Sequence, residues 1–155
     1  MIKVFAIGNI LLGDDGIGVK VMYKIQNEIK SLSKDIEVII GETDFMYCLI
    51  NIEKEDFVII IDSSYFGIDP GRFTIFDFKV CVRFVGDLST QHEENLLKIL
   101  RINHREVKGC LIGIEVSLVD YSLKLSNCLS DRFNCICNEV FEQIKDILKE
   151  KKLGE

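Results

Sequence analysis

Apolar and polar positions along the chain change their period several times, which predicts strands that alternate with helices. Short apolar or alternating runs rich in β-branched side chains are typical of strands. They cover residues 2–7, 36–40, 57–61, 72–78 and 109–116. Apolar residues at helical spacing predict one helix from Gly16 onward and others over residues 45–52, 91–102 and 130–151. This alternation is typical of α/β proteins.

The link between the third and fourth predicted strands is short. Only residues 63–71 join them, whereas a parallel crossover needs about a dozen residues or more. We therefore expect one antiparallel strand in an otherwise parallel sheet. The predicted fold is a three-layer α/β/α arrangement with a twisted, mostly parallel five-stranded sheet and helices on both faces. A length of 155 residues suits a single domain over residues 1–155.

Charge and composition narrow the possible partners. A net charge of −6 argues against nucleic acid, because phosphate binders need clustered Lys and Arg. No apolar run approaches the roughly 20 residues of a membrane-spanning helix, and Met1 leads directly into a strand-like run rather than a signal peptide. We therefore expect a cytoplasmic protein that does not insert into membranes, and we expect a monomer.

Six cysteines are present, and we expect most of them to be buried thiols, because the cytosol is reducing. Cys135 and Cys137 lie two positions apart on a predicted helix, so they should point to opposite faces and not bind one ion together.

Three residues at predicted strand ends carry the candidate chemistry. Ligands of open α/β sheets bind at the carboxyl ends of the strands. Asp15 closes the loop after the first strand, Asp62 follows the apolar run 57–61, and His92 opens the helix after the fourth strand. Two carboxylates and one imidazole would form a partial ligand shell for Ni²⁺, Zn²⁺ or Mn²⁺.

Each candidate also has a structural interpretation. Asp14 and Asp15 could cap the helix that starts at Gly16, because its macrodipole favours carboxylates. Asp62 needs compensation for its charge beside a buried strand, from a cation or from hydrogen bonds in the following turn. A lone histidine such as His92 is usually structural, and His104 is expected on the surface.

Three motifs stand out: GNILLGDDGIG at residues 8–18, GET at residues 41–43 and IDSSYFGIDPG at residues 61–71. Together they resemble one family, the [NiFe]-hydrogenase maturation endopeptidases. The order and spacing of the motifs also fit, and the pattern looks closest to the hydrogenase 3 type. The resemblance runs from Ile2 to about Val116.

The resemblance implies a function and its residues. It implies an aspartyl-type or metal-dependent endopeptidase in which Asp15, Asp62 and His92 bind the metal and carry the catalysis. The expected substrate is the precursor of a [NiFe]-hydrogenase large subunit, which loses a C-terminal extension after nickel insertion. Ni²⁺ is the expected cofactor, supplied by the protein or by its substrate, and Zn²⁺ could occupy the same site. Gly41, Glu42 and Thr43 precede a helix whose amides could bind the peptide, so we expect them to contact substrate.

Two other classes of protein remain open. A noncatalytic metal-binding module with a doubly wound fold could hold Mg²⁺ between Asp14, Asp15 and Asp62. A nucleotide-binding enzyme would share the fold, but the first loop lacks GxGxxG spacing. A serine protease is disfavoured because Gly-x-Ser-x-Gly is absent. Cys48 is a possible but weakly supported nucleophile.

Overall fold

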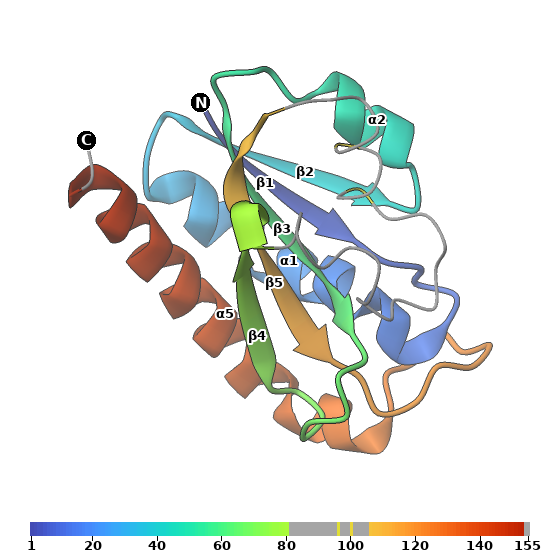
Figure 1. The fold of residues 1–155 in the computed structure, drawn as a ribbon. Coiled ribbons are helices and arrows are strands. Elements are labelled where there is room, and N and C mark those ends of the chain that lie inside the picture. The colour runs from blue at the N-terminus through green and yellow to red at the C-terminus, as the bar shows by residue number, and fades with distance from the viewer. Residues whose placement is uncertain (81–95, 97–99, 101–105, 154–155) are drawn as a thin grey trace.

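A computed structural model describes residues 1–80, 96, 100 and 106–153 (Figure 1). Its strands are β1 (Ile2–Ile7), β2 (Ile36–Glu42), β3 (Phe57–Ser64), β4 (Phe73–Asp77) and β5 (Lys108–Glu115). Its helices are α1 (Ile17–Ser31), α2 (Phe45–Ile50) and α5 (Asn127–Leu153), and a short 3-10 turn, η1 (Gly13–Gly16), precedes α1. The predicted strands and the helices at both ends of the chain are therefore confirmed.

The strands form one sheet in the order β2-β1-β3-β5-β4. Neighbours β2, β1, β3 and β5 are parallel, and β4 is antiparallel to β5. In Figure 1 the arrowheads of β1, β3 and β5 accordingly point to one end of the sheet and that of β4 to the other. The single antiparallel strand was predicted, but its partner is β5 rather than its predecessor β3. Both edges of β3 are already paired, with β1 and β5, so β4 takes the outer edge.

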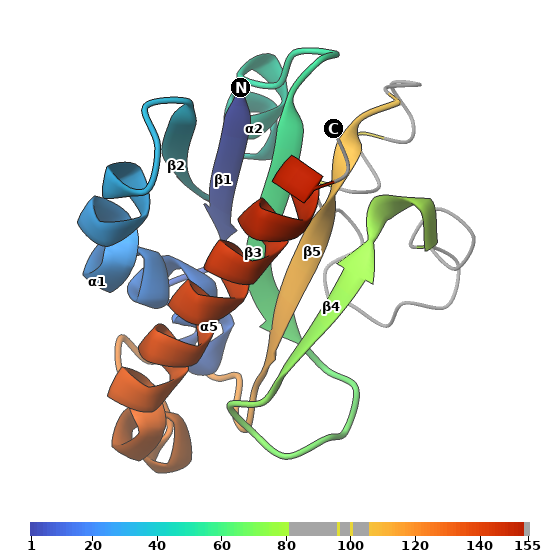
Figure 2. The same ribbon diagram turned by 90° about the vertical axis from the view of Figure 1, so that its left-hand side faces the viewer.

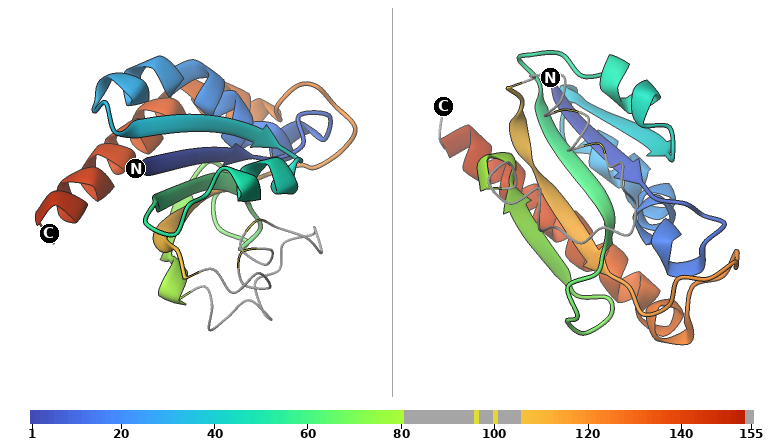
Figure 3. Two further views of the ribbon diagram at one scale, coloured as in Figure 1. Left: turned by 90° about the horizontal axis from the view of Figure 1, so that it is seen from above. Right: turned by 45° about the vertical axis from the view of Figure 1, so that its right-hand side comes forward.

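Helices cover both faces of this sheet. Figure 2 shows α1 and α5 in front of it and α2 behind, and Figure 3 shows the same layers from above. Successive strand residues alternate between the two cores. Val4 and Ala6 pack with α1 and α5, whereas Phe5 and Ile7 pack with α2. This explains why residues 57–61 are apolar throughout, since β3 is buried on both faces. The predicted three-layer α/β/α class is confirmed.

Some element boundaries differ from the prediction. β3 continues to Ser64, so Asp62 lies within the strand and not after it. α5 begins at Asn127 instead of residue 130. Leu129 in its first turn is fully buried in the core, and the Ser130 amide donates to the Ser126 carbonyl at 2.8 Å, so both the apolar repeat and the hydrogen bonding begin earlier than predicted. The predicted helix over residues 91–102 falls mostly outside the described residues. Leu96 and Leu100 are the two residues of this range that the structure describes, and both are buried.

Within the described ranges, no helix combines the length and the apolar character that a bilayer crossing requires. The longest helix, α5, is amphipathic, with its apolar side against the sheet.

The cysteines follow the prediction only in part. Cys48, Cys110 and Cys137 are buried, but Cys128 and Cys135 are exposed on α5, so core burial was the wrong expectation for these two. Cys81 lies outside the described residues. Cys135 and Cys137 do face opposite sides of the helix, as their spacing predicted.

Candidate active site

Three loops meet at the carboxyl edge of the parallel strands. The loop after β1 is joined to the loop after β5, because the Gly13 amide donates to the Ser122 carbonyl at 2.7 Å. The end of β3 joins the same group, because the Val116 amide donates to the Ser64 carbonyl at 3.1 Å. This is the edge where ligands of open α/β sheets bind.

Asp15 lies in η1 at the centre of these loops. Its side chain is only 1% exposed. Oδ1 accepts hydrogen bonds from Ser63 Oγ and from the Tyr65 hydroxyl, both at 2.9 Å, and Oδ2 accepts one from the Asn9 amide at 2.8 Å. Three donors thus hold a buried carboxylate at the end of β1, and two of them come from the end of β3.

Gly8 makes this position of Asp15 possible. Its φ is +137°, and a Cβ added there would lie 2.2 Å from the Asp15 carbonyl oxygen. Only glycine allows the chain to fold back this closely.

Asp62 lies on β3 opposite Gly113 and is half-buried. Its Oδ1 accepts a hydrogen bond from the Ser63 amide at 2.7 Å. Burial raises the pKa of the Tyr65 phenol, and the negative charges of Asp15 and Asp62 both raise it further. Tyr65 therefore remains a protonated hydrogen-bond donor, and the charges of both carboxylates act on its hydroxyl.

Asp14 has a structural role. It is 0% exposed. Its Oδ2 accepts from the amides of Ser117 and Leu118 at 2.9 Å, and its Oδ1 from the amide of Ser126 at 2.7 Å. The capping interpretation of Asp14 and Asp15 is wrong, because the N-cap residue of α1 is Gly16 and no side chain makes a capping hydrogen bond there. The Asp14 carboxylate is occupied by the loop after β5, so it is not available for the Mg²⁺ module considered above.

The donor set fits a divalent cation. Asp15 and Asp62 bring carboxylates from two neighbouring strands to one edge, and carboxylates combined with an imidazole suit Ni²⁺ and Zn²⁺. His92, the predicted third ligand, lies outside the described residues, as does His104. The described residues alone contain no group of three potential metal ligands, so the roles of Asp15, Asp62 and His92 as ligands stay predictions.

The segment Gly41–Thr43 adjoins the loop after β1. The Glu42 carbonyl accepts from the Gly8 amide at 3.1 Å. The Glu42 carboxylate accepts from the Tyr23 hydroxyl on α1 at 3.3 Å. Gly41 is buried and Thr43 is exposed. Contact of Gly41, Glu42 and Thr43 with substrate stays a prediction.

The sequence-based prediction did not include three polar side chains at this edge: two hydroxyls and one carboxylate. The hydroxyls belong to Ser63 and Tyr65, which come one and three positions after Asp62, so their place at the end of a buried strand could have identified them. Glu115 is 3% exposed at the end of β5. It accepts from Ser64 Oγ and the Phe66 amide at 2.9 Å and from the Gly67 amide at 2.8 Å. An acid after a buried apolar strand singled out Asp62, and the same criterion selects Glu115.

Removing one of the two hydroxyls that donate to Asp15 should lower the stability of the protein without preventing folding. We expect Tyr65→Phe and Ser63→Ala each to lower the free energy of unfolding by about 1–2 kcal/mol, because each takes one donor from a buried carboxylate. Urea denaturation followed by circular dichroism measures this. Wild-type stability in both variants would show that these hydrogen bonds do not hold Asp15.

Cys48 is unsuited to nucleophilic catalysis. It is buried beneath Gly41, and burial, followed by the charge of Asp44, raises the pKa of its thiol to about 12. The thiolate is the reactive form of cysteine, so this environment suppresses attack on a peptide bond.

Thiol labelling of the native protein tests this assignment. We expect iodoacetamide at neutral pH to modify the exposed Cys128 readily, while Cys48 reacts only after unfolding, because it is both buried and protonated. Mass spectrometry of tryptic peptides measures each site, with protein in urea as the control. Modification of native Cys48 as fast as Cys128 would contradict the structure.

Comparison with known proteins adds independent information. Residues 19–143 match the family model HycI, described as hydrogenase maturation protease. The hydrogenase expression/formation protein HupD of Bradyrhizobium diazoefficiens is 29% identical over 85 residues, which are 55% of this chain and 44% of HupD. The chain therefore spans less than half the length of this curated relative.

Solved structures of the same family share the fold. The hydrogenase maturating endopeptidase HybD from E. coli superposes with a TM-score of 0.74 at 21% identity, covering 94% of this chain and 92% of HybD. The [NiFe] hydrogenase maturation protease HycI from Thermococcus kodakarensis gives 0.72 at 24% identity, covering 96% of this chain and 92% of HycI. The family match covers most of the chain and includes the motifs at residues 41–43 and 61–71, so the protein belongs to the hydrogenase maturation protease family.

Proposed function

We propose that this protein is a nickel-dependent endopeptidase that removes the C-terminal extension from the precursor of a [NiFe]-hydrogenase large subunit after nickel insertion. The observation that carries the proposal is the placement of Asp15 and Asp62 at the carboxyl edge of β1 and β3, where Ser63, the neighbour of Asp62 on β3, donates its hydroxyl to Asp15. Membership of the hydrogenase maturation protease family supports it.

In this proposal the chain binds the metal through Asp15, Asp62 and His92. When bound, the ion supplies Lewis acidity toward the scissile carbonyl or toward water. Ser63 and Tyr65 hold the Asp15 carboxylate, so it does not have to reorganise as the cation and substrate assemble. Gly41, Glu42 and Thr43, beside the same loop, are proposed to contact the substrate backbone.

The nickel has two possible sources. Either the protein carries it or the precursor brings it in its own site, and three ligands from one chain leave coordination positions open for the partner. The same site is proposed to accept Zn²⁺. We propose that the reaction takes place in the cytoplasm and that the enzyme acts as a monomer.

The experiment that tests the proposal is incubation of the purified protein with the large-subunit precursor, followed by mass measurement of the products. One cut that releases a C-terminal fragment supports the endopeptidase assignment. An unchanged precursor mass under all metal conditions would overturn it.

A further inference from the structure

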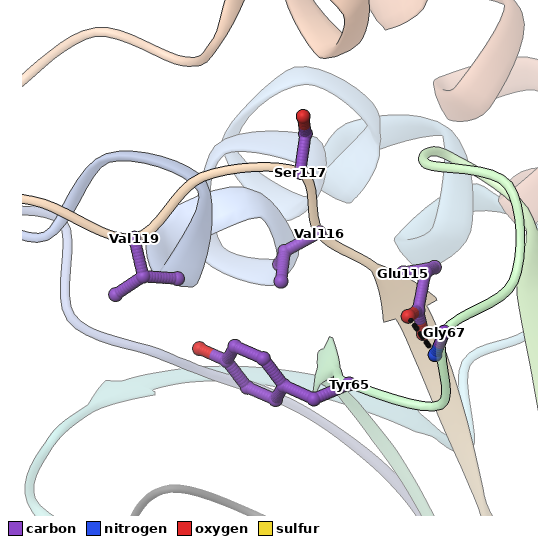
Figure 4. A pocket seen from close by; sticks show the side chains of 6 residues that line it. All are labelled: Tyr65, Gly67, Glu115, Val116, Ser117 and Val119. Atoms are coloured by element: carbon purple, nitrogen blue, oxygen red, sulfur yellow. Dashed lines mark hydrogen bonds between the residues drawn. The ribbon is translucent and has the colours of Figure 1, made fainter.

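A pocket of about 270 Å³ lies between the loop after β3 and the loop after β5, and Tyr65 forms part of its lining (Figure 4). Its lining residues are Tyr65, Gly67, Glu115, Val116, Ser117 and Val119. In Figure 4 the side chains of Val116 and Val119 point toward Tyr65, and Ser117 points away. Tyr65 is a shared wall, because its hydroxyl donates to Asp15 Oδ1 at 2.9 Å while its ring lines the pocket.

Two buried carboxylates fix the two loops that form this pocket. Glu115 binds the loop after β3 through Ser64 Oγ and the amides of Phe66 and Gly67. The side chain of Asp14 similarly binds the loop after β5, through three backbone amides that belong to residues 117, 118 and 126. Neither carboxylate has a role in the proposed chemistry, and charged groups are almost never fully buried unless they are paired. Their bonds make the pocket a preformed site.

The size and the lining of the pocket define what it can hold. Sites for whole small molecules usually measure about 300–1,000 Å³, so this pocket suits a single side chain of a longer chain. Its walls combine an aromatic ring and two valines with polar groups, and the polar groups make up the larger part of its exposed lining. Glu115 is buried and already accepts three hydrogen bonds, so it offers little to a cationic group. The neighbouring Asp15 and Asp62 disfavour an anionic one.

We propose that this pocket binds an uncharged side chain of the substrate peptide, close to the bond that is cut, and that Tyr65 links this binding site to Asp15. The inference rests on the proposed endopeptidase function and adds a specificity-determining site to it. Residues near the cut bond would then be selected by their fit between Tyr65, Val116 and Val119.

The test uses one filling variant with a matched control. Val119→Trp places an indole in the pocket, and Leu118→Trp makes the same kind of change on a neighbouring side chain that is 53% exposed and does not line it. A fluorescently labelled synthetic peptide, spanning the precursor's C-terminal extension and the residues before it, is the probe. Fluorescence anisotropy measures its Kd, calorimetry measures Ni²⁺ affinity, and thermal melting checks the fold.

We expect Val119→Trp to weaken peptide binding at least about tenfold and to lower kcat/KM for the precursor in proportion. Ni²⁺ affinity should stay unchanged, and Leu118→Trp should behave like wild type. Val119→Ala, which removes contacts without filling the pocket, should weaken peptide binding about threefold to fivefold. This variant provides the test if Val119→Trp does not fold.

Two outcomes separate this inference from the proposed function. Wild-type peptide affinity and cleavage in both Val119 variants would overturn the pocket assignment alone, because the enzyme would still cut its precursor. A wild-type protein that neither binds the peptide nor cuts the precursor would overturn the endopeptidase function, and the pocket assignment with it.

Discussion

Replacement of Asp62 by Asn is expected to reduce precursor cleavage by more than about 100-fold while the protein stays folded. The change keeps the shape of the side chain and removes its charge. Loss of a group that only supports a metal ligand typically costs about 10–100-fold, so loss of a ligand charge should cost more. Asp62 is half-buried, and its charge and that of Asp15 both raise the pKa of Tyr65. Removal of one negative charge from this edge should leave the metal-free variant as stable as wild type, or more stable.

Asp69→Asn is a suitable control for Asp62→Asn. Asp69 follows the same strand, and its side chain is 82% exposed, so the same chemical change should leave cleavage unaffected. Rates come from gel densitometry of the precursor, and Ni²⁺ affinity comes from calorimetry. Processing by Asp62→Asn at the wild-type rate would remove Asp62 from catalysis, and an unchanged nickel affinity would also remove it from the ligand set.

Replacement of Asp14 by Ala is expected to cost about 3–4 kcal/mol of unfolding free energy. The carboxylate is 0% exposed and accepts hydrogen bonds from the amides of Ser117, Leu118 and Ser126. Its removal leaves three amides without their acceptor, and each unsatisfied buried group costs about 1–3 kcal/mol before relaxation and water entry reduce the sum. A loss of this size is a large part of the stability of a typical domain.

The control here is Asp120→Ala, in the same loop. Asp120 is exposed, and surface substitutions usually stay within about 0.5 kcal/mol. Urea denaturation in a metal chelator compares the two variants with wild type, so metal binding does not enter. A loss below about 1 kcal/mol for Asp14→Ala would show that the loop after β5 does not depend on this carboxylate.

The periodicity of the sequence was sufficient to predict the layers of the fold, but it did not predict which strands are neighbours in the sheet. Continuous apolar residues at 57–61 correctly predicted a buried strand, because both faces of β3 are covered. Loop length correctly predicted that β4 runs antiparallel. It could not show that β4 pairs with β5, since that depends on which sheet edge the other strands leave open.

Side-chain roles at the carboxyl edge were harder to predict than the edge itself. Asp14 and Asp15 are adjacent, yet one binds the loop after β5 and the other faces the end of β3. Local sequence favoured helix capping for both. Apart from Asn9, which is a nearby donor to Asp15, their partners lie 48 to 112 positions further along the chain. Tyr65 was missed for the same reason. A contact between strand ends depends on the register of the sheet, which no local pattern encodes.

The measurement that tests the central claim most directly compares nickel-loaded and nickel-free precursor as substrates of the same enzyme preparation, with product masses read by intact mass spectrometry. We expect the nickel-loaded precursor to lose its C-terminal extension in one cut and the nickel-free precursor to keep its full mass. Equal cleavage of both forms would contradict nickel dependence, and a full-length mass for both would contradict the endopeptidase function itself.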